Sequence, residues 1–271
     1  MNLAVSSSFF PGLDFETVAA RAKEFGFDGV ELVAAVCGSD STGANVFLTD
    51  PAKINRAFEL AGVGIACVEG SISYTGEKHR DAKSAEELKR VVSIARELNC
   101  RLVTVGVRAG ASGSSAMATA MGLGDWLQPM GDRAADCGVM LAVKNGPAIR
   151  TARQMWAALD RLRHPAIACC WDVCAATSAG EGPLVSVPVL NSRIQYAHVG
   201  LADMGTSDPA IRKFLTRLQG IGYGGYVTIL PAPKGSSSTP ETTLPKATAQ
   251  LRGWLAPPVN TKPTHKKHPS P

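Results

Sequence analysis

The sequence predicts a (β/α)8 TIM barrel over residues 1–256. Eight short apolar segments of strand length recur along the chain, and segments with apolar residues at helical spacing separate them. Alternation of this kind indicates parallel strands joined by helical crossovers, and eight repeats are the number that closes a barrel. The 271 residues are enough to bury a core of that size.

The eight predicted strands are rich in Val, Ile, Leu, Ala and Cys, which is typical of strands buried on both faces. The sixth, AIACCWDVC, carries Asp172, a carboxylate that costs free energy there unless it is hydrogen-bonded, paired or bound to a metal. We therefore expect several strands to end around Asp172. The predicted strands span 3–6, 29–33, 63–69, 101–107, 139–145, 166–174, 194–199 and 226–230.

Capping signals mark the helices between these strands. Asp14 is a predicted N-cap, and Asp50-Pro51 and Asp208-Pro209 place a proline in a first helical turn. The patterns at 84–87 and 151–154 match capping boxes and predict two further helix starts. Residues 109–115 are rich in Gly and Ser and predict a flexible lid, and 180–191 predict a loop with a short helix.

Composition narrows the class of protein. The formal net charge is +5, and the sequence shows no cluster of Lys and Arg before residue 257 of the kind that nucleic-acid binding needs. Residues 257–271 are rich in Pro, Lys and His and predict a disordered tail.

Seven cysteines without framework spacing indicate reduced thiols. No run of residues is apolar enough for a signal peptide or a membrane span. We expect a cytoplasmic protein without nucleic-acid or membrane partners, and a homo-oligomer stays open.

The polar residues at the strand ends define the expected site, because active sites of TIM barrels lie at the carboxyl ends of the strands. Arg108 has the geometry to take a phosphate or carboxylate in a bidentate manner. Glu31 and Glu69 would either contact a hydroxyl group of a ligand or support Lys144 and Arg108. The expected site residues are Glu31, Glu69, Arg108, Lys144, Asn145, Asp172 and His198, with Leu230 at the end of the eighth strand.

Several motifs resemble one known family. FGFDGVEL at 25–32 resembles its second-strand signature, and CGVMLAVKN, CCWDVCAA, IQYAHVG and GYGGYVTIL resemble its fifth to eighth strands in the right order. The chain thus resembles the sugar phosphate isomerase/epimerase family of xylose-isomerase-like TIM barrels over residues 1 to about 255. The resemblance implies carbohydrate metabolism, with isomerisation or epimerisation through proton transfer next to a carbonyl.

The resemblance also implies a divalent metal, held by Glu, Asp, His or Gln, and Glu on the fifth to eighth strands. Asp172 and His198 match this pattern, but Lys144, Ala175 and Leu230 stand where the family has Glu, His and Glu. One carboxylate and one imidazole are a poor site for Mg²⁺ or Mn²⁺. We therefore expect no cofactor. The alternative is Mn²⁺, Mg²⁺, Co²⁺ or Zn²⁺ on Asp172 and His198, with Cys174 as a substitute ligand on the extended strand.

Three functions remain open at this stage. The first is an isomerase-like barrel that binds a small polyhydroxylated or carboxylated ligand, with Lys144, Asp172 and His198 as catalytic residues and Glu31, Glu69, Arg108 and Asn145 as ligand-binding residues. The second is a non-catalytic pseudo-enzyme in which Lys144 replaces the metal and pairs with Asp172, Glu31 or Glu69. The third is a Schiff-base lyase or aldolase with Lys144 as nucleophile.

Overall fold

The computed structural model describes residues 1–34, 45–108, 116–231 and 239–256. The predicted lid at 109–115 and the predicted tail at 257–271 lie outside these ranges, as does Cys37. Within the described ranges no helix is both long enough and apolar enough to cross a membrane.

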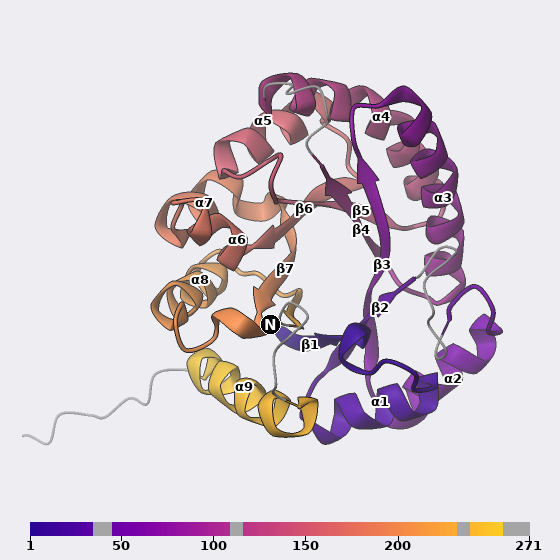
Figure 1. The fold of residues 1–271 in the computed structure, drawn as a ribbon, viewed down its shortest axis with the longest axis vertical. Coiled ribbons are helices and arrows are strands. Elements are labelled where there is room, and N and C mark those ends of the chain that lie inside the picture. Colours follow the sequence, from indigo (N-terminus) through magenta and orange to yellow (C-terminus); the bar gives the residue numbers. More distant parts are fainter. Residues whose placement is uncertain (35–44, 109–115, 232–238, 257–271) are drawn as a thin grey trace, which may run out of the picture.

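Eight parallel strands form a closed barrel in sequence order, and β1 completes the ring by pairing with β8. Helices surround the ring, as Figure 1 shows in a view down the barrel. The predicted (β/α)8 fold is confirmed. The strands are β1 Asn2–Ser6, β2 Gly29–Val33, β3 Gly64–Tyr74, β4 Leu102–Val107, β5 Met140–Lys144, β6 Ile167–Asp172, β7 Ile194–Gly200 and β8 Tyr226–Leu230.

The helices lie between the strands and pack on the outer face of the barrel. Short 3₁₀ helices follow β1 (Ser7–Phe9) and β7 (Leu201–Asp203), and a third precedes β7 (Asn191–Arg193). The α-helices are α1 Phe15–Glu24, α2 Pro51–Ala61, α3 Lys78–Glu97, α4 Ala116–Asp136, α5 Ala152–Leu162, α6 Val173–Ser178, α7 Pro183–Leu190, α8 Asp208–Gly220 and α9 Pro240–Leu255.

Most capping signals act as expected. The Asp14 carboxylate accepts from the Thr17 amide at the start of α1, and Thr151 and Gln154 form the predicted capping box of α5. Gly62 ends α2 in the left-handed conformation at φ 64°, which glycine adopts without steric cost.

The capping box predicted at 84–87 is wrong. Helix α3 already begins at Lys78, and the hydroxyl of Ser84 donates to the carbonyl of Ser73. The Asp81 carboxylate accepts from the amide and the hydroxyl of Thr75, which fixes the chain ahead of the helix. Strand β3 also continues to Tyr74, five residues beyond its predicted end, so the connection into α3 is short.

The predicted strand at 166–174 is too long. Strand β6 ends at Asp172, and α6 starts at Val173. The reason is the Asp172 carboxylate, whose Oδ1 accepts from the amides of Cys174 and Ala175, both at 2.9 Å. This N-cap turns the chain into a helix directly after the strand.

The interior of the barrel holds small residues beside polar ones. Ala4, Ala66, Cys67, Ala142 and Cys170 pack around Tyr196 inside the ring. In a parallel sheet, residues paired across neighbouring strands point to the same face. The register pairs Lys144 with Cys170 and Asp172 with His198. Polar side chains therefore point into the barrel at its carboxyl end.

Candidate functional site

The strand register brings most of the expected site residues onto the inner face of the barrel. It pairs Ser6 with Glu31, Val33 with Glu69, and Asp172 with His198. The structure thus places Glu31, Glu69, Lys144, Asp172 and His198 around one barrel mouth, but it divides them into three separate groups.

The first group is a buried pair between β2 and β7. Nε2 of His198 lies 2.7 Å from Oε2 of Glu31, and each residue is only 1% exposed. Burial acts to raise the pKa of Glu31, but the contact with His198 and the charge of Lys144 outweigh it, so the pKa lies below its usual value. Glu31 is therefore a carboxylate at neutral pH.

His198 is contacted on its other side as well. Nδ1 lies 3.5 Å from the Cys170 sulfur, and the Tyr196 ring packs edge-on against the imidazole at a centroid distance of 5.2 Å. Burial raises the pKa of Cys170 well above its usual value, so the sulfur stays a thiol. Both ring nitrogens of His198 thus already face protein atoms.

The second group is an ion pair between β3 and β5. Nζ of Lys144 lies 3.4 Å from Oε1 of Glu69, which also accepts from the Ser71 amide. Burial acts to lower the pKa of Lys144, but the carboxylates of Glu69 and Glu31 outweigh it, and the pKa is raised. Lys144 is therefore an ammonium group, and its partner is Glu69 rather than Asp172.

The third group holds the ends of β5 and β6 together. Asn145 Nδ2 donates to the Asp172 carbonyl at 2.9 Å, and the Asp172 amide donates to Asn145 Oδ1 at 2.6 Å. With the Asp172 carboxylate capping α6, both residues have structural partners here. Asn145 positions the strand end that carries Asp172.

A cavity of about 360 Å³ opens beside the second group, over the ends of β3, β4 and β5. Its polar lining consists of Glu69, Ser71, Ser73, Arg108, Lys144 and Asn145. The cavity thus joins four of the expected site residues, while Asp172, His198 and Glu31 do not line it.

The residues at the mouth do not fit a hard divalent cation. The lysine ammonium stands at the end of β5, the aliphatic Leu230 ends β8, and His198 and Asp172 are engaged as described above. Mg²⁺ and Mn²⁺ need several oxygen ligands. Across residues 1–34, 45–108, 116–231 and 239–256, no three His, Cys, Asp or Glu side chains gather as a metal site would require.

The sequence argument for Cys174 as a ligand depends on an extended strand, and that geometry is wrong. Cys174 lies in α6, one residue beyond its start. Burial raises the pKa of its thiol to about 12, whereas zinc binds the thiolate. The helix that Asp172 caps turns Cys174 away from the direction of the strand.

Sequence reasoning missed the serines of the cavity, Ser71 and Ser73. They belong to the extension of β3 beyond Glu69, where ISY alternates apolar and polar residues. This short alternation was the available signal, because in a strand it places every second side chain on the same face. The sequence analysis also did not predict the contact between Cys170 and His198.

A closed eight-strand barrel whose polar residues gather at the carboxyl strand ends is the architecture of TIM-barrel proteins. The model of the family described as "xylose isomerase-like TIM barrel" matches residues 19–256. The chain belongs to this family.

Solved structures share the fold at low sequence identity. The chain is similar to 3-keto-D-glucoside 4-epimerase from E. coli, with 13% identity, a TM-score of 0.77 and coverage of 94% of this chain and 98% of that one. D-psicose 3-epimerase shows 14% identity, a TM-score of 0.78 and coverage of 94% and 99%. A sugar phosphate isomerase/epimerase from Parabacteroides distasonis shows 14% identity, a TM-score of 0.72 and coverage of 94% of each chain. No curated protein matches the chain.

Proposed function

We propose that this chain binds a small polyhydroxylated carboxylate, a sugar acid, in the cavity over β3, β4 and β5. The observation that carries the proposal is that Arg108 and Lys144 line this cavity together with a single carboxylate, Glu69. Two cations against one anion leave the cavity positive, which favours an anionic ligand. A volume of about 360 Å³ suits a ligand of this size.

The individual groups suggest how such a ligand would be held. Arg108 offers a planar guanidinium that matches a carboxylate in two parallel hydrogen bonds. Lys144 contributes a point charge, while Ser71 and Ser73 offer hydroxyls to the sugar chain. The similar structures named above are enzymes of sugars, which supports a sugar-like ligand.

We further propose that this site works without a divalent metal. The Lys144 ammonium supplies positive charge at the end of β5, and the Asp172 carboxylate is committed to two backbone amides. A cation beside Lys144 would meet repulsion, which lowers its affinity. The chain would then be a family member that binds sugars without the family's metal-dependent proton transfer.

A Schiff-base role for Lys144 is less well supported. An amine attacks a carbonyl only in its neutral form, and enzymes that use lysine in this way lower its pKa. The pKa of Lys144 is raised instead, with Glu69 holding the charged form. Lys144 is better suited to bind an anion than to act as a nucleophile.

The test is a ligand screen by saturation-transfer NMR in the presence of EDTA. The panel contains gluconate, glucuronate, glucose, fructose and fructose 6-phosphate. We expect the carboxylates to bind, and Arg108→Ala and Lys144→Met to abolish their signals, while Lys53→Ala on α2, which does not line the cavity, serves as control. Equal binding of neutral sugars, or carboxylate signals that survive both cavity variants, would refute the proposal.

A further inference from the structure

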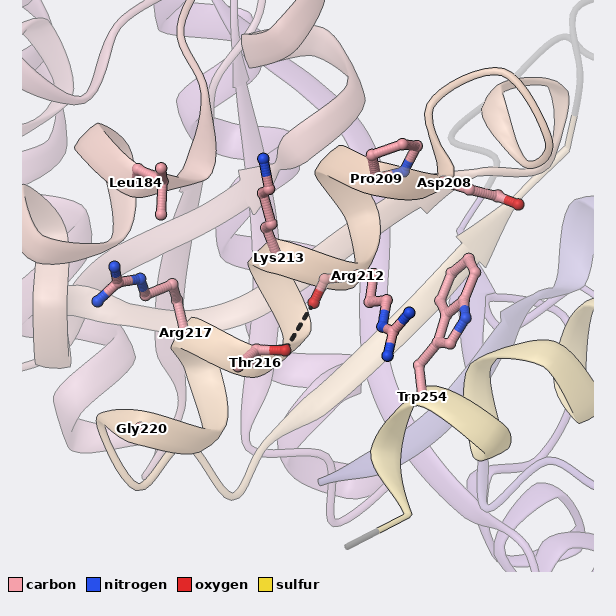
Figure 2. A pocket seen from close by; sticks show the side chains of 9 residues that line it. All are labelled: Leu184, Asp208, Pro209, Arg212, Lys213, Thr216, Arg217, Gly220 and Trp254. Carbon is pink, nitrogen blue, oxygen red and sulfur yellow. Dashed lines mark hydrogen bonds between the residues drawn. The ribbon is translucent and has the colours of Figure 1, made fainter. Parts of the chain in front are cut away.

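A second, larger hollow lies on the outside of the barrel and shares no lining residue with the cavity over β3, β4 and β5. It has a volume of about 820 Å³ and follows the outer face of α8, between α7 and α9. Figure 2 shows α8 crossing the view with Leu184 of α7 on one side and Trp254 of α9 on the other. We call it the α8 groove.

The α8 groove follows a regular stripe of its helix. Residues of α8 at spacings of three and four line it, which places them on one face. The stripe spans about 16 Å at 1.5 Å per residue, enough for a peptide segment of about five extended residues. Its members are Pro209, Arg212, Lys213, Thr216, Arg217 and Gly220.

The floor of the groove is made by the short members of this stripe. The Thr216 hydroxyl bonds back to the carbonyl of Arg212 within the helix. Gly220 has open space where a side chain would begin, since a Cβ there meets no atom within 4 Å. The backbone of another polypeptide can therefore approach α8 closely at Gly220.

The charge of the groove is positive. Arg212, Lys213 and Arg217 are exposed, and their side chains are drawn in Figure 2 on both flanks of the helix. The one acidic member, Asp208, is already engaged, because its carboxylate oxygens accept from the Gly205 amide at 2.6 Å and the Gln250 side chain at 2.7 Å. Three basic side chains against this one carboxylate leave the groove with a net positive charge.

Next to the groove stands an apolar helix. Helix α7, PLVSVPVL, has no charged residue, although a surface helix normally has a polar outer face. Leu184 is 52% exposed, Val185 56% and Val189 40%. Exposed apolar groups gathered in this way mark interaction surfaces. A further hollow of about 430 Å³, lined by Val185, Val189 and Trp156, lies on the other flank of α7.

We propose that the α8 groove and the exposed side of α7 form a docking site for an acidic segment of a partner protein, one that carries apolar side chains between its carboxylates. The carboxylates pair with Arg212, Lys213 and Arg217, and the apolar side chains pack on Leu184, Val185 and Trp254. Arg and Trp in one groove are the residue types that dominate binding energy in protein interfaces.

Charge complementarity selects this occupant over the others. The segment 257–271 of the chain itself is basic, with Lys262, Lys266 and Lys267, and would be repelled. A second copy that docked here in a two-fold dimer would bring its own Arg212, Lys213 and Arg217 into the same interface, where the like charges repel. A membrane surface is flat, whereas the apolar ridge of α7 separates two hollows that accept protruding side chains.

The test is selection of binders from a random 12-residue peptide library displayed on phage, with the full-length chain as target. We expect enriched peptides to be acidic with interspersed apolar residues. The best of them, made synthetically with a fluorescent label, should bind at least tenfold more weakly to a chain with Arg212→Glu, Lys213→Glu and Arg217→Glu. Lys53→Glu with Arg56→Glu on α2 is the matched control for exposed charge.

A second variant keeps the test independent of charge and folding. A Cβ at position 220 meets no heavy atom within 4 Å, so Gly220→Trp can place an indole in the groove; it should abolish peptide binding while the circular dichroism and the thermal midpoint stay unchanged. The proposal is overturned if no peptide is enriched, if enriched peptides are neutral or basic, or if they bind the Gly220→Trp variant equally well. Displacement of the peptide by vesicles with phosphatidylserine, but not by neutral vesicles, would replace the protein partner with a membrane.

Discussion

His198 and Glu31 form a pair inside the barrel, with Nε2 2.7 Å from Oε2 and each residue 1% exposed. The two residues come from β7 and β2, so the contact crosses the interior. A buried carboxylate is costly unless it is paired. This contact therefore fixes His198 in a structural arrangement and holds it away from a ligand at the mouth.

The first prediction concerns the loss of this pair. Glu31→Ala should lower the free energy of unfolding by about 3 kcal/mol, because it leaves a buried imidazole without its partner. Glu31→Gln, which keeps the size and an acceptor oxygen, should cost less. Urea denaturation at neutral pH measures both. An Ala variant as stable as the wild type would show that the pair contributes nothing.

The same pair predicts a dependence on pH. The pKa of Glu31 is lowered in the folded protein from the usual 4.5. Its stabilisation is therefore complete above that pH and is lost as pH falls through the folded pKa. The stability difference between wild type and Glu31→Gln should shrink below pH 4.5, as calorimetry at several pH values would show. A difference that stays constant would contradict the lowered pKa.

A third prediction concerns Asp172 as a helix cap. Asp172→Ala should destabilise the protein by about 1 kcal/mol, because two amides of α6 lose their acceptor, while Asp172→Asn should retain most of the stability. Thermal unfolding in EDTA and in Mn²⁺ would separate capping from metal binding. If Asp172 served a metal, the loss would appear only in the presence of Mn²⁺.

The thiols give a fourth prediction. Among the six cysteines of the described residues, Cys137 is partly exposed and the others are buried. Burial raises the pKa of Cys100 to about 12, so it stays unreactive near neutral pH. A thiol reagent should label Cys137 before Cys67, Cys100, Cys169, Cys170 and Cys174, as peptide mapping would reveal. Early labelling of Cys170 would mean that the barrel interior opens readily.

The fold was predictable because its signals are local and repeated. Apolar runs and caps such as Asp14 and Thr151 act within a few residues of chain, and their order along the sequence defines the barrel. Predicted element boundaries were wrong where another contact overrides the local sequence pattern. Ser84 matches an N-cap, but Asp81 and Thr75 start the helix earlier, and Asp172 turns a strand into a helix through its own side chain.

The positions of the expected site residues were predictable from the sequence, but the contacts between them were not. Position at the strand ends identified Glu31, Glu69, Lys144, Asp172 and His198 as neighbours. Which carboxylate meets Lys144 depends on differences of a few ångströms across the barrel, and on Asp172 being used by α6. The register of the barrel is irregular between β2 and β3 and between β6 and β7, and no local pattern in the sequence reveals these shifts.

The central claim is that Arg108 and Lys144 hold a sugar acid without a metal. The most direct measurement is calorimetric titration of gluconate into the protein, once in EDTA and once in Mn²⁺. We expect the same affinity in both, and a loss of about tenfold or more in Arg108→Ala, since a hydrogen bond to a charged group contributes about 1.5–3 kcal/mol. Binding only in Mn²⁺, abolished by Asp172→Ala and unaffected by Arg108→Ala, would contradict the claim.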